Sequence, residues 1–397
     1  MNLLGSGSYG CVTNKSIKKK ALKLNYISDT DKKSFDLDEK NGKHIAKFFI
    51  DTKSYCEELL IINLILNKYY QVFGTVNVFN ELSVLPKRCA TYTIKDNNDT
   101  IKKEHINKLF NNNQVTSCLY DIITYDSDYI HEIVYNDGGQ QLGKVVLTDY
   151  ELVKSLIVFC KSLETFHELN FVHRDIKDDN ILYKDGKLSL IDYGLSVEAR
   201  NVYSDIEEWF VGGAYFLHPP EYAIYNKTNM FRNLDLFHLE YKNEHFYNVK
   251  KKEYEKFLSK YENVTNINNM PKELKDIAYQ GDVYSLGTVL LFIYLRFKNI
   301  KITYHDKDLI DNKFKTLITN MIITDPFERY TIKQVINDLL EISSYFHTNT
   351  NNVNLNKTEC LNNITSITEN LSKLKTQKGG KYKVKKKAKK FPKIKLL

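Results

Sequence analysis

The sequence lacks paired cysteines, long apolar runs and a signal peptide. Its 6 cysteines show no C-x-x-C spacing, so neither a zinc ribbon nor a redox dithiol is indicated. The longest apolar runs, Leu59–Leu66 and Val289–Leu295, are far shorter than the ~20 residues that a transmembrane helix needs. The first residues run directly into Gly5 and leave no room for a signal peptide. We therefore expect no transmembrane segment and a reducing intracellular compartment, either cytoplasmic or nuclear.

Proline and glycine are also scarce, with 6 and 16 residues among 397, while Lys, Asn, Ile and Tyr are plentiful. This bias is typical of an AT-rich genome and says little about the fold. A hydrophobic content of 42% and a charged content of 27% are ordinary for a soluble globular protein. The length permits two or three domains and a large core.

The net charge of +8 belongs to the end of the chain. Residues 378–397 contain 10 lysines and no acidic residue, so the other residues sum to about −2. We expect one domain at 1–347 and a C-terminal extension at 348–397 whose basic end is disordered. The lysines suit nucleic acid, an anionic membrane, an acidic protein or a nuclear address, and a purely solubilising role stays open.

The stretch 173–180, with the sequence HRDIKDDN, concentrates the polar chemistry of the chain. It follows an apolar stretch that predicts a helix, with Thr148 as its cap. Behind it, Asp185-Gly186 predicts the turn of a hairpin over Ile181–Ile191. The hairpin delivers Asp192 in the sequence Asp-Tyr-Gly. Acids and an amide thus stand in two neighbouring stretches, one before the hairpin and one after it.

A glycine-rich stretch lies near the N-terminus, where residues 5–12 read GSGSYGCV. Glycine lets the backbone approach phosphate groups closely and adopt positive φ. A lysine follows it in Ala21-Leu22-Lys23, after a tight turn expected near residues 14–15, and lysine acts as a mobile point charge for phosphate. The candidate nucleotide-binding residues of this region are Leu4, Gly5, Gly7, Gly10, Val12, Ala21 and Lys23.

A helix is predicted over Ser54–Tyr70, because Glu58 and three isoleucines recur at helical spacing. Residues 28–52 before it are charged and irregular, and they predict a loop. We select Glu58 as the acid on the inner face of the helix, while Glu57 stays open as the alternative.

These elements resemble the eukaryotic-type protein kinases, over about residues 3–345. HRDIKDDN is similar to their catalytic loop, Asp-Tyr-Gly to their metal-binding D-F-G, and the glycines with Lys23 to their ATP-binding strands. The resemblance implies an α+β bilobal fold. A small β-rich N-lobe would occupy about 1–135 and a larger, mainly helical C-lobe about 136–347.

The resemblance also implies roles for the catalytic residues. Asp175 would accept or orient the proton of the substrate hydroxyl, and Lys177 would neutralise charge on the transferred phosphoryl group. Asn180 and Asp192 would hold Mg²⁺, or Mn²⁺ in its place, next to ATP. Glu58 would pair with Lys23.

Two further residues of the loop would be structural. His173 would support the metal-binding acid, and Arg174 would pair with a phosphate in the activation segment.

The hinge between the lobes is predicted from two strand-like segments, Val76–Leu85 and Tyr129–Tyr135, which flank a polar insertion near 96–114. Ile133 would be the gatekeeper residue. The backbone from Ile133 to Tyr135 would hold adenine, although the hinge glutamate usual in the family is absent.

Three motifs of the C-lobe complete the resemblance. Glu221 stands in Pro-Pro-Glu, Asp282 opens DVYSLG, and Arg329 follows Asp-Pro. The family implies a buried ion pair between Glu221 and Arg329, and hydrogen bonds from the catalytic-loop backbone to Asp282. An insertion at about 226–271, and Ala214 where threonine is usual, depart from the family on the substrate side.

The implied function is an ATP- and Mg²⁺-dependent serine/threonine protein kinase, because Lys177 lies two residues after Asp175. Two alternatives stay open. A pseudokinase scaffold is disfavoured because the catalytic set is present, and a nucleic-acid- or membrane-tethered protein would act through its basic tail. The insertions and the AT-rich composition are also similar to kinases of large DNA viruses, which would place the protein in a host cell or virion.

Overall fold

The computed structural model describes residues 3–7, 10–13, 24–26, 44–49, 52–84, 86–94, 117–118, 129–204, 218–224, 231–232, 234–235, 244–264, 269–297 and 307–348. The chain divides into two units, Met1–Phe346 and His347–Leu397. The predicted positions Ala21, Lys23 and Ala214 and the basic tail lie outside the described residues.

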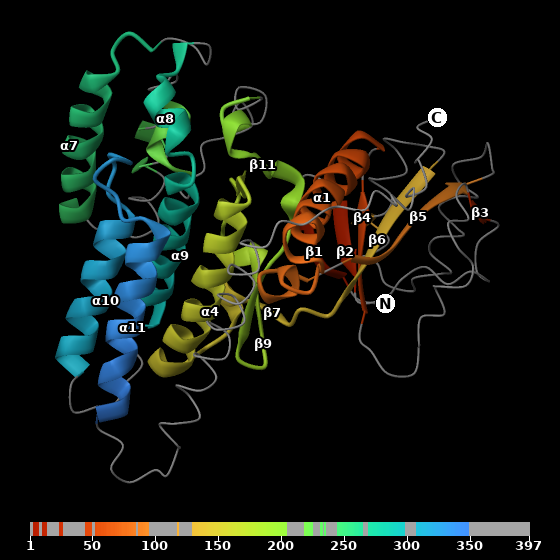
Figure 1. Cartoon of the computed structure of the whole chain (residues 1–397), viewed down its shortest axis with the longest axis horizontal. Coiled ribbons are helices and arrows are strands. Elements are labelled where there is room, and N and C mark those ends of the chain that lie inside the picture. The colour runs from red at the N-terminus through yellow and green to blue at the C-terminus, as the bar shows by residue number, and fades with distance from the viewer. Residues whose placement is uncertain are drawn as a thin grey trace, which may run out of the picture. The chain divides into compact units, whose positions relative to one another are not determined.

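The first unit begins with a six-stranded antiparallel sheet, which α1 (Thr52–Phe73) covers on one face (Figure 1). The strand order is β1-β2-β4-β6-β5-β3. The strands are β1 (Leu3–Gly7), β2 (Gly10–Thr13), β3 (Leu24–Tyr26), β4 (His44–Phe49), β5 (Pro86–Ile94) and β6 (Tyr129–Asn136). Because β4 lies inside residues 28–52, the prediction of a loop there was wrong. Its short apolar run, with Ala46 and Phe48 fully buried, fits a strand that is buried on both faces of the sheet.

Helix α1 confirms the predicted helix and extends it at both ends. Its inner face buries Tyr55, Glu58, Ile62 and Ile65, at the helical spacing that the sequence showed. The helix ends before Gly74, whose φ of +70° is the left-handed conformation that commonly stops a helix. The amphipathic pattern therefore places Glu58 toward the interior of the lobe.

The strand predicted at Val76–Leu85 is wrong. Residues Phe79–Glu81 form a 3₁₀ turn instead, and the next strand begins only at Pro86. Phe79 and Leu82 are both buried in the core, and side chains three residues apart share one side of a 3₁₀ turn. A strand would have placed these two residues on opposite faces.

The rest of the unit is a mainly helical lobe (Figure 1). A capping box opens α4, since the Thr148 hydroxyl accepts from the Glu151 N–H and the Glu151 carboxylate accepts from the Thr148 N–H, as expected from Thr148. One apolar core joins α4, α9, α10 and α11. The helices are α4 (Asp149–Glu168), α7 (Glu244–Lys260), α8 (Lys272–Asp276), α9 (Gln280–Phe297), α10 (Lys307–Met321) and α11 (Ile332–Thr348).

Two small sheets accompany these helices and carry the catalytic segments. The predicted hairpin over Ile181–Ile191 is confirmed as β9 and β10 around Asp185-Gly186. The order of the larger sheet is β10-β9-β7, and β11 pairs with β8 in the other. The strands are β7 (Gln140–Gln141), β8 (Phe171–Val172), β9 (Ile181–Lys184), β10 (Lys187–Leu190) and β11 (Val197–Glu198).

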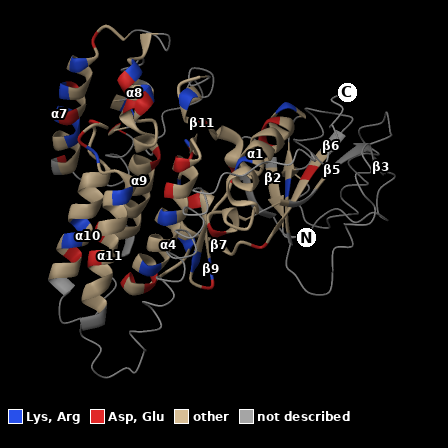
Figure 2. Ribbon diagram, viewed as in Figure 1, with Lys and Arg blue, Asp and Glu red and all other residues tan. Residues whose placement is uncertain are grey.

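Helix α7 lies in the insertion predicted at 226–271 and packs on the helical lobe. The Lys250 amine donates to the carbonyl of Ile322, and the hydroxyls of Tyr254 and Tyr284 are 3.1 Å apart. Figure 2 shows acidic and basic residues interspersed along the described helices. Among the described residues, no helix is both long and apolar enough to span a membrane.

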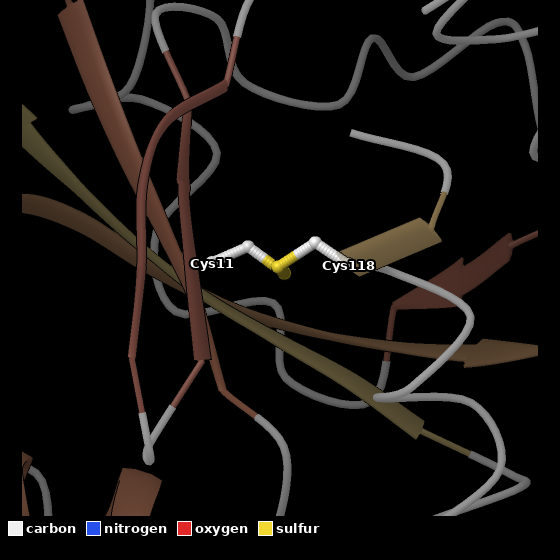
Figure 3. Close-up of a disulfide and its surroundings, with 2 residues drawn as sticks. All are labelled: Cys11 and Cys118. Atoms are coloured by element: carbon white, nitrogen blue, oxygen red, sulfur yellow. A yellow bond between two sulfur atoms is a disulfide. The ribbon is translucent and has the colours of Figure 1, made fainter. Parts of the chain in front are cut away.

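A disulfide joins Cys11 of β2 to Cys118 (Figure 3). In the sequence, Cys118 belongs to the segment that connects β5 to β6. Cys11 stands opposite Phe48 in the β2–β4 register, and Phe48 stands opposite Glu132. All three are fully buried, on the sheet face away from α1. The spacing did not predict this pair, since connectivity cannot be deduced from sequence alone.

We expect Cys118→Ser to lower the free energy of unfolding by about 2–4 kcal/mol, because the bond closes a long loop of the unfolded chain. Guanidinium titration without reductant measures the change, and adding reductant to the wild-type protein should reproduce it. Cys56→Ser supplies the control, since Cys56 is exposed and takes no part in this bond, so its loss should lower stability far less. A Cys118→Ser protein as stable as the wild type would contradict the bond.

Candidate active site

A buried lysine connects three elements that are distant in the sequence. The Lys47 amine on β4 lies 2.6 Å from Glu58 Oε2 on α1 and 2.9 Å from Asp192 Oδ1. Burial lowers the pKa of Lys47, but the attraction of Asp192 and Glu58 outweighs burial and leaves the pKa above its usual value. Burial raises the pKa of Glu58, and Lys47 opposes this shift. The amine is therefore a cation fixed between two acids.

The lysine that pairs with Glu58 is thus Lys47, whereas the sequence predicted Lys23. Lys23 itself lies outside the described residues. The prediction failed because the glycine-rich strands are followed by 30 residues, 14–43, before β4 begins. The signal that would have found Lys47 is its setting in His44-Ile45-Ala46-Lys47-Phe48-Phe49, a short apolar run just before α1. Glu58, rather than Glu57, is the acid that reaches the lysine.

The catalytic-loop residues form a second cluster. The Lys177 amine lies 3.1 and 2.8 Å from the two Asp175 oxygens. The Asn180 amide nitrogen donates to the Asp175 carbonyl at 2.9 Å and to Asp175 Oδ2 at 2.8 Å. Burial raises the pKa of Asp175, and Lys177 acts against this shift. Because its nitrogen is engaged, Asn180 has its amide oxygen as the atom suited to a cation.

Asp192 follows strand β10 and begins a 3₁₀ turn, Tyr193–Leu195, with a positive φ of 65°. Burial raises the pKa of Asp192, but Lys47 and Lys177 overcome this and bring the pKa below its usual value. The side chain is therefore an ionised carboxylate. Tyr193 anchors the turn, since its ring packs on Phe79 and His173 at centroid distances of 5.4 and 4.9 Å.

Asp282, at the start of α9, holds the backbone of the catalytic loop. It is fully buried, and it accepts the predicted backbone hydrogen bonds from His173 at 2.8 Å and Arg174 at 2.9 Å. His167 of α4 lies 3.0 Å from the same carboxylate. The position of the catalytic loop is therefore fixed by two helices of the lobe.

Arg174 has a setting that the resemblance did not imply. Its guanidinium donates to the backbone carbonyls of Leu195, Val202 and Ser204, and the residue is buried. These acceptors all belong to the segment that begins at Asp192. Arg174 thus holds that segment through its backbone carbonyls.

Apart from Glu58 on α1, the described residues of the predicted nucleotide-binding set lie on one hairpin and on β6. Leu4, Gly5 and Gly7 are on β1, Gly10 and Val12 are on β2, and Gly5 stands opposite Val12. Val12 in turn stands opposite Lys47, so both point to the α1 side of the sheet. The hairpin therefore aims Val12 at the side where Lys47 lies.

Ile133, the predicted gatekeeper, stands opposite Lys47 in the β4–β6 register. It packs with Phe49 and Tyr55 in a small apolar cluster. The side chain that reaches Glu58 is Tyr135, whose hydroxyl donates to Glu58 Oε1 at 2.8 Å. The residues predicted as the hinge, 133–135, lie inside β6, which ends at Asn136.

Glu221 and Arg329 form the predicted buried ion pair. Their two bonds measure 2.7 and 2.9 Å, and the side chains are 4% and 0% exposed. Arg329 also donates to the carbonyls of Ile323, Gln280 and Thr324. One arginine thus joins the end of the activation segment to α9 and to the turn before α11.

We expect Arg329→Met to cost about 3–5 kcal/mol of stability, because it leaves Glu221 buried without its partner. Chemical denaturation measures this loss. Lys313→Ala is the matched control, since Lys313 pairs with Glu341 at the surface and should matter little. Equal effects of the two substitutions would show that burial of the pair is unimportant.

The sheet with α1, the helical lobe and the catalytic loop define a bilobal protein kinase fold. A family model described as a protein kinase domain matches residues 68–340, which is more than half of the chain. The chain therefore belongs to the protein kinase domain family. The match begins after Glu58, so the lysine–glutamate pair is an observation of the structure alone.

Curated relatives are similar at low identity. A probable receptor-like protein kinase of Arabidopsis thaliana is 26% identical over 40% of this chain and 47% of its own length. A probable casein kinase I homolog of Encephalitozoon cuniculi is 34% identical over 21% of this chain and 30% of its own. The serine/threonine-protein kinase dst1 of Dictyostelium discoideum is 25% identical over 56% and 27%. The chain thus spans less than half the length of each.

Proposed function

We propose that the chain is a serine/threonine protein kinase, which transfers the γ-phosphoryl group of ATP to Ser and Thr hydroxyls of proteins. The observation that carries this proposal is the bridge from Lys47 to both Glu58 and Asp192. It brings a phosphate-binding cation to a carboxylate that follows the catalytic loop. These groups come from β4, α1 and the segment after β10.

The donor set fits a hard divalent cation. Asp192 is an ionised carboxylate, and the amide oxygen of Asn180 complements it. When bound, Mg²⁺ would neutralise charge on the ATP phosphates, and Mn²⁺ accepts the same oxygen ligands. The side chains that would hold the cation are therefore Asn180 and Asp192.

Asp175 would orient the substrate hydroxyl and take its proton. Lys177 and Asn180 hold its carboxylate in one orientation, which leaves little rotational freedom to lose when the substrate binds. Burial raises the pKa of Asp175, which makes it a stronger proton acceptor than an exposed aspartate. Lys177, beside it, would stabilise the negative charge that develops on the transferred group.

The preference for Ser and Thr rests on Lys177, two residues after Asp175, as in Ser/Thr members of the family. The name of one relative, the serine/threonine-protein kinase dst1, agrees with this preference.

The test is transfer of radiolabel from the γ-position of ATP to matched peptide arrays that offer Ser, Thr or Tyr in the same contexts. We expect labelled Ser and Thr peptides and unlabelled Tyr peptides. Label on Tyr alone would overturn the specificity. Binding of Mg²⁺-ATP without transfer to any peptide would favour a pseudokinase scaffold.

A further inference from the structure

Glu58 is held from both of its carboxylate oxygens. Lys47 binds Oε2 at 2.6 Å, and the Tyr135 hydroxyl donates to Oε1 at 2.8 Å. Glu58 itself is only 2% exposed. A buried carboxylate that loses one of its partners is strongly destabilised, so both bonds matter for its position.

The strand register explains why Tyr135 can reach this acid. In the β4–β6 pairing, Tyr135 stands opposite Ile45 and Ile133 stands opposite Lys47. Directly opposed residues of neighbouring strands point to the same face of a sheet. Tyr135 and Lys47 therefore approach α1 from the same face, two residues apart along the pairing, and converge on one glutamate.

We propose that Tyr135 is a positioning residue of the phosphotransfer site, which ties Glu58 to the sheet and so keeps Lys47 directed toward Asp192. This inference rests on the proposed function. Without the phenol hydroxyl, Glu58 would be held by Lys47 alone, and α1 would lose the hydrogen bond that connects it to β6. Lys47 would then spend less time in the orientation that phosphate binding requires.

The chemistry of the phenol agrees with this role. Burial, and then the neighbouring Glu58 charge, raise the pKa of Tyr135 well above its usual value. The hydroxyl therefore stays protonated near neutral pH and is always available as a donor to the carboxylate. A phenylalanine would fill the same space without that donor, which makes Tyr135→Phe a narrow test.

The test compares peptide phosphorylation by the wild type, Tyr135→Phe and Tyr254→Phe. Tyr254 of α7 is the matched control. Its buried hydroxyl also forms a hydrogen bond, but with the Tyr284 hydroxyl rather than with Glu58. We expect Tyr135→Phe to lower kcat about tenfold, as for loss of a hydrogen bond to a charged group. The KM for peptide should stay unchanged, and Tyr254→Phe should keep the wild-type kcat.

A double-substitution cycle shows whether Tyr135 acts through Glu58. In a Glu58→Gln background, adding Tyr135→Phe should change kcat by less than about twofold, because the bond is already weakened. The inference is overturned if Tyr135→Phe matches an active wild type. It is also overturned if the full tenfold effect persists in the Glu58→Gln protein.

Hydrogen exchange separates this inference from the proposed function. Amides of α1 around Glu58 should exchange faster in Tyr135→Phe than in Tyr254→Phe, whether or not phosphate is transferred. A wild type that transfers no phosphate would refute the kinase proposal. Hydrogen exchange of α1 would then test by itself whether Tyr135 holds Glu58. Equal α1 exchange in the two variants would refute the tie.

Discussion

Lys47→Met is expected to lower kcat/KM for phosphotransfer about 100- to 1,000-fold, as for the removal of one preorganised charged group. Lys23→Met should leave it unchanged. Lys47 is fixed by Glu58 and Asp192, so it presents its charge without reorganisation when phosphate binds. Methionine keeps the length of the side chain and removes the charge.

The two lysine variants form a direct comparison, because the sequence pointed to one residue and the structure points to the other. Steady-state transfer of labelled phosphate to a Ser peptide measures both. Circular dichroism of Lys47→Met controls for folding, since the variant leaves Glu58 and Asp192 without their shared cation. Loss of activity in Lys23→Met with an active Lys47→Met would reverse our assignment.

Asp175→Asn is expected to lower kcat about 100- to 10,000-fold, as for loss of a positioned general base. The amide cannot accept the hydroxyl proton, yet it has nearly the same shape as the carboxylate. Lys177 can still contact a side-chain oxygen at position 175, and Asn180 can still donate to the backbone carbonyl there. The loop should therefore keep its conformation. ATP binding should therefore survive while transfer is lost.

Asp179→Asn is the matched control for Asp175→Asn. Asp179 is an exposed acid of the same loop, and the Gln141 amide donates to its backbone carbonyl rather than to its carboxylate. Its substitution should leave kcat close to the wild-type value. If Asp179→Asn removed activity and Asp175→Asn did not, the base would have been misassigned.

The catalytic loop was predictable because its chemistry is local. Residues 173–180 and Asp192 follow one another along a helix, a loop and a hairpin, so no long-range pairing had to be guessed. Glu58 was predictable for a related reason, since the helical period of α1 already separates its buried face from its exposed face.

Lys47 was missed, and Tyr135 was expected only as a hinge residue, because their contacts with Glu58 depend on strand register across the sheet. The residues between β2 and β4 broke the spacing that the family led us to expect, and the lysine-rich stretch before Lys23 supplied a plausible substitute. The pairing of Tyr135 with Ile45 places the Tyr135 side chain on the face of the sheet where Glu58 lies.

The bond between Cys11 and Cys118 was unpredictable for a third reason. Six cysteines without a motif allow many pairings, and only the folded sheet brings these two together. The segment Val76–Leu85 shows a fourth reason for a failed prediction. Its composition is typical of a strand, but Phe79 and Leu82 are buried together on one side of a 3₁₀ turn.

The most direct test of the central claim is transfer of the ATP γ-phosphate to a Ser/Thr peptide library, measured side by side for the wild type, Lys47→Met and Asp175→Asn. The account predicts phosphorylated Ser and Thr products with the wild type and nearly none with either variant. Wild-type protein that yields no product, or variants as active as the wild type, would contradict it.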